Sequence, residues 1–323
     1  MITFSLIIPV YDRPDEVDEL LESLSKQTYT AFDIIVVEDG SVESCENIVD
    51  KYSKVLNIRY FYIKNHGPGG ARNYGVQHST SEYIIVLDSD CLVPPSYLEN
   101  VNKSLQETEA VAFGGADKAH PSFTTIQKAI NYSMTSFFTT GGIRGSKGAM
   151  DKFYPRSFNM GIRRDVYLAL SGFSDMRYGE DIDFSIRLFK GGYKCCYFDD
   201  AWVYHKRRTD LLQFFKQVNH SGKARIVLYQ KHPESLKIVH LLPAMFTIGL
   251  VLLLIIAIAF PIVLLLLLLY ILILFIDSLI KNKNIIVAFV SVPAAFVQLT
   301  AYGTGFITNI WNKYILHKSL RLF

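Results

Sequence analysis

The chain has 323 residues, of which 50% are hydrophobic and 20% are charged, and its formal net charge is +3. This length exceeds one small domain, and so small a net charge gives no indication of a nucleic-acid partner. Charged residues are unevenly distributed, since none occurs between Leu241 and Ile276. The sequence therefore predicts a soluble domain over residues 1–235 and a membrane domain over residues 236–323.

Apolar runs and amphipathic segments alternate through the first hundred residues. The expected strands are 4–11, 32–41, 58–64 and 82–90, and the expected helices are 13–28, 43–54 and 67–79. Further strands are expected at 110–115, early in 157–173 and at 194–205, with helices late in 157–173 and at 178–193. Strands that alternate with helices predict an α/β fold with a mostly parallel, doubly wound sheet. Such sheets bind ligands beyond the carboxyl ends of their strands.

Two of these strands end in acidic residues. Glu38 and Asp39 close the second strand, and Asp88 and Asp90 follow the very apolar fourth strand. An Asp-x-Asp tripeptide is by itself often a solvated turn, but its place after a buried strand favours a functional role. Carboxylate oxygens suit Mg²⁺ or Mn²⁺, which tend to bind together with substrate phosphates. We therefore expect the two acidic strand ends to share one site.

The stretch GPGGARNYG (67–75) opens a predicted helix. It is not a Walker loop, because no Gly-Lys-Ser/Thr follows, and it lacks the third glycine of a dinucleotide-binding loop. One interpretation is a glycine-rich loop that caps the helix. The other is close approach of the backbone to a ligand, with Arg72 near a phosphate or a base.

The stretch GEDIDFSIRL (179–188) begins a predicted helix with three acids, Glu180, Asp181 and Asp183. Acids favour the first turn of a helix for electrostatic reasons, yet three exceed what capping requires. One of them is therefore a candidate general base. His205 follows a predicted strand, and it either has a structural role or completes a metal site of carboxylates.

The uncharged run after Leu241 is too long for one membrane crossing. As a single helix it would measure about 54 Å, whereas a bilayer core is about 30 Å thick. Two spans are expected at about 238–258 and 262–280, the alternative being a buried pair of core helices. A third segment at 285–308 either spans or follows a re-entrant or interfacial path. A full crossing would leave Lys313, Lys318 and Arg321 outside, against the positive-inside tendency.

The pattern of apolar and polar residues over 209–231 predicts an amphipathic helix on the membrane surface. Its expected apolar side consists of Leu211, Leu212, Phe214, Phe215 and Val218. No signal-peptide pattern begins the chain, and the four cysteines show no disulfide or zinc spacing. We therefore expect a cytosolic soluble domain attached to the cytoplasmic membrane by several spans.

Five motifs in order carry a resemblance to a known family. SLIIPVYDRPDEVDELLESLSKQTYTAFDIIVVEDGS, GPGGARNYG, YIIVLDSD, SFNMGIRRDVY and YGEDIDFSIRLFKGG resemble the inverting family-two glycosyltransferases of GT-A fold. The resemblance covers about residues 3–230. It implies that Asp88 and Asp90 hold a divalent metal, Mg²⁺ or Mn²⁺, on the donor diphosphate, with Asp90 the closer ligand. His205 matches a position that ligates the metal in some members.

The resemblance also assigns the other site residues. The nucleotide-sugar contacts implied are Pro9, Tyr11, Asp39, Arg72 and Asp88, where Pro9 and Tyr11 pack on the base and Asp39 contacts the nucleoside. Asp181 matches the general base, and Asn159 and Glu180 are expected near the donor sugar or the acceptor.

These matches imply transfer of one sugar from a nucleotide-diphospho-sugar, expected to be a UDP-sugar, to a lipid-linked polyprenyl glycan at the inner membrane. The Gln-x-x-Arg-Trp motif of processive synthases is missing, which argues against a long polymer. The tail QLTAYGTGF (298–306) resembles membrane-bound transferases of exopolysaccharide synthesis. A polyprenyl-phosphate sugar synthase and a catalytically silent membrane scaffold are the alternatives.

Overall fold

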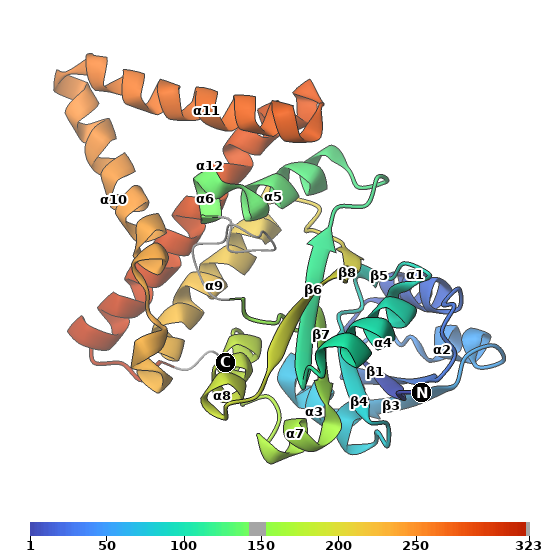
Figure 1. The fold of residues 1–323 in the computed structure, drawn as a ribbon. Coiled ribbons are helices and arrows are strands. Elements are labelled where there is room, and N and C mark those ends of the chain that lie inside the picture. The colour runs from blue at the N-terminus through green and yellow to red at the C-terminus, as the bar shows by residue number, and fades with distance from the viewer. Residues whose placement is uncertain (142–152, 321–323) are drawn as a thin grey trace. The chain divides into compact units, whose positions relative to one another are not determined.

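The computed structural model describes residues 1–141 and 153–320. The chain divides into two compact units, the first consisting of Met1–Lys118 and Phe153–His205. The described part of the second unit comprises residues 119–141 and 206–320. Figure 1 labels the elements of both. The sequence predicts a boundary at 235 from membrane character, and this boundary stays a prediction.

The first unit is built on one eight-stranded mixed sheet with the order β3-β2-β1-β4-β7-β6-β8-β5. The strands are β1 Phe4–Val10, β2 Phe32–Asp39, β3 Ile58–Ile63, β4 Tyr83–Leu87, β5 Cys91–Leu92, β6 Ala112–Lys118, β7 Asn159–Arg163 and β8 Cys195–His205. The neighbours β3, β2, β1 and β4 are parallel, as is the pair β6 and β8. Strand β7 runs antiparallel to both β4 and β6, and β5 runs antiparallel to β8. The predicted mostly parallel α/β sheet is confirmed.

Helices cover both faces of this sheet, which is why its central strands are apolar throughout. They are α1 Pro14–Leu24, α2 Glu46–Tyr52, α3 Gly67–Gln77, α4 Tyr97–Thr108, α7 Arg164–Ala169 and α8 Glu180–Lys190. Successive strand residues point to opposite faces. Leu6 and Ile8 therefore pack in the core that contains α1, α2 and α4, whereas Ile7 packs in the core that contains α3, α7 and α8.

The glycine-rich stretch lets α3 lie directly on the sheet. A side-chain carbon at Gly75 would lie 2.6 Å from the methyl group of Ile7. This close approach lets the second half of α3 pack against β1 and β2.

The second unit is helical. Its helices are α5 Thr125–Thr135, α6 Phe137–Thr140, α9 Leu211–Lys231, α10 Ile238–Ala259, α11 Leu264–Asn282 and α12 Ile285–Ile310. Short 3-10 turns occupy Pro233–Ser235 and Pro261–Val263, and a π-helical turn, Trp311–Ile315, follows α12. Among the described residues, three segments are long and apolar enough to cross a membrane, namely Ile238–Ala259, Pro261–Asn282 and Ile285–Ile315. This finding suggests membrane association.

Helix α9 forms at the place predicted for an amphipathic surface helix, but part of its apolar side is occupied by protein. Phe214 and Val218 are buried in a cluster with Ile130 and Ala301, whereas Leu212 is 65% exposed. Phe214 and Val218 are therefore not available to lipid, because α9 contributes them to the core of its own unit.

Candidate active site

The carboxyl ends of β1, β2 and β4 lie at one edge of the sheet, because these strands are parallel neighbours. The crevice at such an edge is where open α/β sheets bind ligands. Asp39 is the last residue of β2, and Asp88 follows β4 directly. Pro9 lies near the end of β1 and Tyr11 follows it, with 49% of its surface exposed. The two acidic strand ends thus meet at one edge, as the sequence indicates.

The two acids that end β2 have different environments. Glu38 is fully buried, accepts the backbone N–H of Cys45 and bonds the hydroxyl of Tyr60. Asp39 accepts the backbone N–H of His66 at 2.7 Å, and burial raises its pKa although this N–H opposes the shift. Glu38 therefore holds the local fold, and Asp39 lies at the carboxyl end of β2, where its contact with the nucleoside stays a prediction.

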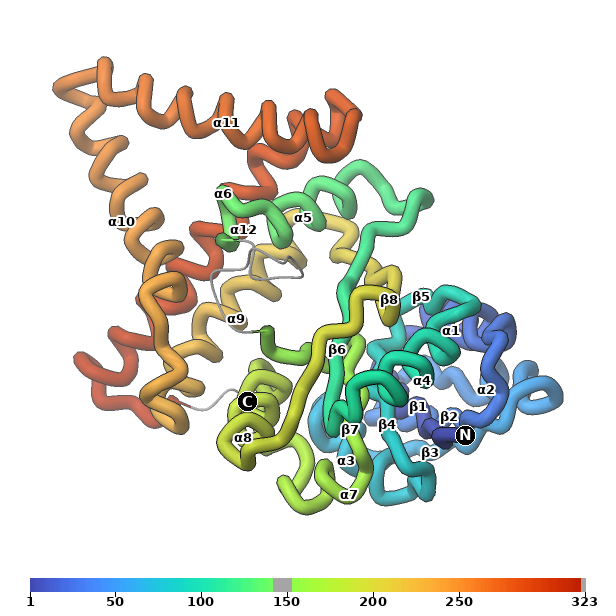
Figure 2. The backbone as a smooth tube through the Cα atoms, viewed as in Figure 1, coloured from blue at the N-terminus to red at the C-terminus, as the bar shows by residue number. Residues whose placement is uncertain are grey.

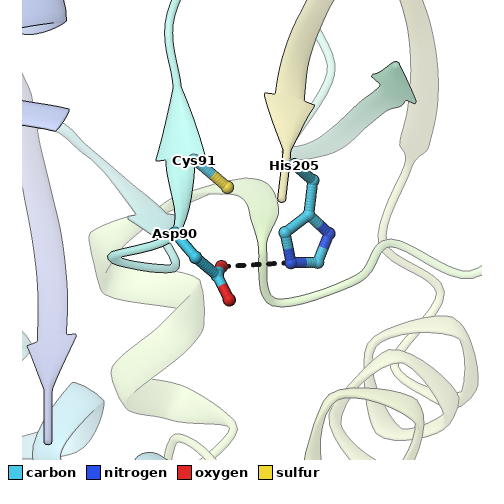
Figure 3. Close-up of side chains that lie close together, drawn as sticks. All are labelled: Asp90, Cys91 and His205. Carbon is cyan, nitrogen blue, oxygen red and sulfur yellow. Dashed lines mark ion pairs between the residues drawn. The ribbon is translucent and has the colours of Figure 1, made fainter. Parts of the chain in front are cut away.

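Asp90 and His205 come together because β5 pairs with β8, which sets Cys91 opposite His205. Oδ1 of Asp90 lies 3.1 Å from Nε2 of His205, and Oδ2 lies 2.5 Å from Nη1 of Arg13. Figure 3 shows the first contact. Burial would raise the pKa of Asp90, but His205 and Arg13 outweigh it and hold that pKa well below its usual range. Asp90 is therefore ionised and faces two basic side chains.

This pair fits a divalent metal. Oδ1 of Asp90 is buried and faces Nε2 of His205. A separation of 3.1 Å also matches two ligands at right angles, about 2.1 Å from one ion. Nδ1 of His205 lies 3.8 Å from a carboxylate oxygen of Asp117, and metal-binding histidines are commonly oriented by such a carboxylate.

Cys91 lies within 4.8 Å of the same two groups, but it is a poor candidate ligand. Its thiol is buried and lies 3.6 Å from the carbonyl oxygen of Phe158. Soft thiolate ligands suit Zn²⁺ or Cu⁺, whereas Mg²⁺ and Mn²⁺ prefer carboxylate oxygens. Among the groups near this point, Asp90 and His205 are thus the better pair for Mg²⁺ or Mn²⁺.

Asp88 is held by a different partner. Arg72 is almost completely buried and donates at 2.7 Å both to Asp88 and to Glu180. The ion pairs connect α3, the end of β4 and the start of α8. Arg72 therefore holds Asp88 and Glu180 in position. Its contact with the nucleotide-sugar stays a prediction. Asp88 keeps 28% of its side chain exposed, which leaves it accessible beside Asp90.

Asp181 begins α8 next to Glu180, and both side chains are buried. Nε of Arg156 donates to Asp181 at 2.7 Å, and the N–H of Ile182 donates to its other oxygen at 2.8 Å. Burial alone would raise the pKa of Asp181, but Arg156 outweighs it and lowers that pKa. Burial raises the pKa of Glu180 despite its contact with Arg72.

Two other sequence candidates have structural partners. Asp183 pairs with Arg187 at 3.0 Å one turn further along α8. Asn159 is fully buried, accepts the hydroxyl of Tyr97 at 2.6 Å and donates to the carbonyl of Ala201 at 2.8 Å. The amide of Asn159 thus joins β7 to α4 and β8, and its contact with the sugar or the acceptor stays a prediction.

Sequence reasoning missed three residues near these acids, namely Arg13, Asp117 and Arg156. Arg13 is 77 positions from Asp90, and Arg156 is 25 positions from Asp181. Arg13 lies within the first quoted motif and Arg156 directly precedes another, but nothing in the local pattern indicates the partner of either. The only usable signal was the excess of acids, since buried carboxylates require counter-charges.

Comparisons with known proteins identify the family of the chain. A family model described as glycosyl transferase family 2 matches residues 5–170, just over half of the chain. An uncharacterized glycosyltransferase of Rickettsia felis is 34% identical over 141 residues, which are 43% of this chain and 22% of that protein. The putative glycosyltransferase EpsH of Bacillus subtilis is 34% identical over 109 residues, 33% of this chain and 32% of EpsH. These alignments span less than half the length of the curated relatives.

Solved structures of other proteins have a similar fold. The mannosyltransferase PcManGT from Pyrobaculum calidifontis, in complex with GDP-Man and Mn²⁺, aligns with a TM-score of 0.67 at 17% identity and covers 97% of this chain and 88% of its own. Residues 1–349 of Staphylococcus aureus TarS, in complex with UDP-GlcNAc, align with a TM-score of 0.50 at 21% identity, over 68% of this chain and 65% of that one. With the family match over its sheet and the acids at the sheet's carboxyl edge, the chain belongs to glycosyl transferase family 2 and has the GT-A fold.

Proposed function

We propose that this protein is a metal-dependent inverting glycosyltransferase that moves one sugar from a nucleotide-diphospho-sugar to an acceptor at a membrane. The observation that carries the proposal is the convergence of Asp90 and His205 at the sheet edge that also holds Asp39. Solved relatives in complex with UDP-GlcNAc, or with GDP-Man and Mn²⁺, support this class of donor. A UDP-sugar is the donor we propose.

Each acid has a distinct task in this proposal. Asp90 and His205 hold Mg²⁺ or Mn²⁺, and Asp88 lies beside them, anchored by Arg72. The bound metal would neutralise the departing diphosphate. Asp39 binds the nucleoside, and Asp181 accepts the proton of the acceptor hydroxyl, since a hydroxyl is a poor nucleophile until that proton is removed.

The acceptor we propose is a lipid-linked polyprenyl glycan, as used in cell-surface polysaccharide synthesis. The support is the three apolar helices of the second unit, which would keep the enzyme where such a carrier resides. A basic segment precedes them, with eight Lys and Arg against two acids between His205 and Lys237. Such a segment suits the anionic cytoplasmic leaflet, so we place the catalytic unit in the cytosol at the inner membrane.

A donor screen tests the reaction and its metal requirement together. Purified protein in detergent is mixed with UDP- and GDP-sugars and with a lipid extract as acceptor, and the released nucleoside diphosphate is measured. We expect release with one donor, complete loss in EDTA and recovery with added Mn²⁺ or Mg²⁺. Unchanged release in EDTA would exclude the metal role.

The contact of Arg156 with Asp181 predicts a change in pH dependence. Arg156 lowers the pKa of Asp181, so Arg156→Gln is expected to raise it. The ionised base then forms only at higher pH, and the acid limb of the kcat/KM profile should move to higher pH. Arg72 and Glu180 are the other charged groups that act on Asp181, and both remain in this variant.

Arg163→Gln is the matched control for this profile. Arg163 also pairs with an aspartate at 2.7 Å in the same unit, but its partner Asp165 is largely exposed. We expect its pH profile to match that of the unmodified protein. An acid limb that does not move in Arg156→Gln would show that Asp181 does not titrate as the base.

A further inference from the structure

Helices α10 and α11 form a hairpin whose two legs both pack on α12, where Phe296 contacts Phe246 of α10 and Tyr270 of α11. In the first half of α10, Oγ1 of Thr247 lies 3.5 Å from the carbonyl oxygen of Leu299, and a side chain at Gly303 would collide with the carbonyl of Pro243. Near the end of α11, Ser278 donates to Ser291 at 2.7 Å, and both residues are fully buried. Figure 2 shows α12 joining the two legs like the base of a triangle.

The turn between the legs points away from α12 and is strongly apolar. Ile258, Phe260 and Ile262 are 85%, 63% and 70% exposed. Each leg has 22 residues and is about 33 Å long, enough to cross a bilayer core of about 30 Å. If both legs cross, their outer ends lie on one side of the membrane. Helix α12 begins beside the outer end of α11 and reaches the first half of α10, which favours a path along that same side.

Helix α9 restricts α12 further, because the two helices run side by side. Asn219 donates to the carbonyl of Ala301 at 3.1 Å, and Asn309 donates to the carbonyl of Lys223 at 2.9 Å. Contacts advance in the same direction along both helices, so they are roughly parallel here. Gly222 allows the approach, since a side chain there would lie 2.2 Å from the carbonyl oxygen of Tyr302.

The charged side chains of α9 exclude this helix from the hydrocarbon core of the bilayer. The helix contains no acidic residue, and its Lys and Arg residues are Lys216, Lys223, Arg225 and Lys231. Four cations on one helix would be very costly in a bilayer core. Because the second half of α12 lies beside α9, it must share the depth of α9 at the membrane surface.

The end of α12 has the composition of an interfacial segment. Trp311 and Tyr314 are 56% and 50% exposed, and they alternate with Lys313 and Lys318. Aromatic and basic side chains of this kind gather at the level of the lipid head groups.

We propose that α12 is a surface helix and not a third membrane span. The chain then crosses twice, through α10 and α11, and α9 and α12 form a basic platform on the anionic cytoplasmic leaflet. Lys313 and Lys318 stay in the cytosol, in agreement with the positive-inside tendency. This arrangement replaces the third predicted span at 285–308, whose length and apolar character made it resemble a crossing.

Cysteine labelling with a membrane-impermeant maleimide tests this topology in sealed vesicles of both orientations. Single variants Ser319→Cys, Lys283→Cys and Ile262→Cys are compared with the unmodified chain as background. All three positions are exposed and lie outside the catalytic unit. We expect position 262 to label only in right-side-out vesicles, and positions 283 and 319 to label only in inverted ones.

Labelling of position 319 only in right-side-out vesicles would overturn the proposal and establish three crossings. Labelling of positions 262 and 319 from the same side would also overturn it, because the hairpin would then not cross. A green fluorescent protein fused after Phe323 gives an independent reading, since it should fluoresce only if the end of the chain is cytosolic. None of these results depends on catalytic activity, so they can fail independently of the proposed reaction.

Discussion

Asp90→Ala is expected to reduce sugar transfer by at least about 100-fold. Loss of a residue that only orients a metal ligand typically costs about 10- to 100-fold, so loss of a direct ligand should cost at least as much. Asp90 lies beside both His205 and Arg13. Its removal leaves two basic groups facing each other where the metal should bind.

The variant should also bind Mn²⁺ more weakly, as measured by calorimetry in the presence of UDP. Asp33→Ala is the matched control, because Asp33 is similarly buried and pairs with Arg59 at 2.6 Å. Asp33 lies near the start of β2, at the amino ends of the parallel strands and thus far from the candidate site. The control should keep its activity, and thermal unfolding should show both variants folded. Near-normal turnover in Asp90→Ala would rule out the metal site.

Asp181→Asn is expected to reduce turnover by at least about 100-fold while donor binding stays near normal. A positioned general base contributes roughly 10²- to 10⁴-fold, and asparagine keeps the shape but not the basicity. Asp181 is buried and already held by Arg156 and the N–H of Ile182, so the substitution should not move α8. The measurement is kcat from initial rates, with donor affinity measured separately.

Glu180→Gln is the decisive comparison, because Glu180 is the adjacent acid and burial raises its pKa. Adjacent helical residues point about 100° apart, so the two acids do not serve one hydroxyl. Asp183→Asn should have little direct effect on the chemistry, since Asp183 pairs with Arg187.

A larger loss of turnover in Glu180→Gln than in Asp181→Asn would transfer the base to Glu180. Full activity in Asp181→Asn would instead favour the polyprenyl-phosphate synthase, whose phosphate acceptor needs little base catalysis.

The sheet and the position of its acids were predictable from sequence. Apolar runs such as Tyr83–Leu87 identify strands that are buried on both faces, and an acid directly after such a run must lie at the ligand-binding edge. The partners of these acids were not predictable. Arg13 and Arg156 reach their acids only through the packing of distant segments, and side-chain direction does not follow from local pattern.

The membrane part shows the same division between local and distant information. Hydropathy identified α10, α11 and α12 as apolar helices, because this signal is a local sum over residues. It could not show that α12 packs beside the charged helix α9, since that depends on the fold of the whole unit. The burial of Phe214 among α5 and α12 was hidden for the same reason.

The most direct test of the central claim is the binding of UDP and GDP to the purified protein, measured with and without Mn²⁺. The account predicts that one nucleotide binds, that Mn²⁺ strengthens the binding, and that Asp90→Ala removes the Mn²⁺ effect while Asp181→Asn retains it. Binding that is equally strong in EDTA and in Asp90→Ala would contradict the account, because Asp90 and His205 would then hold no metal for the donor.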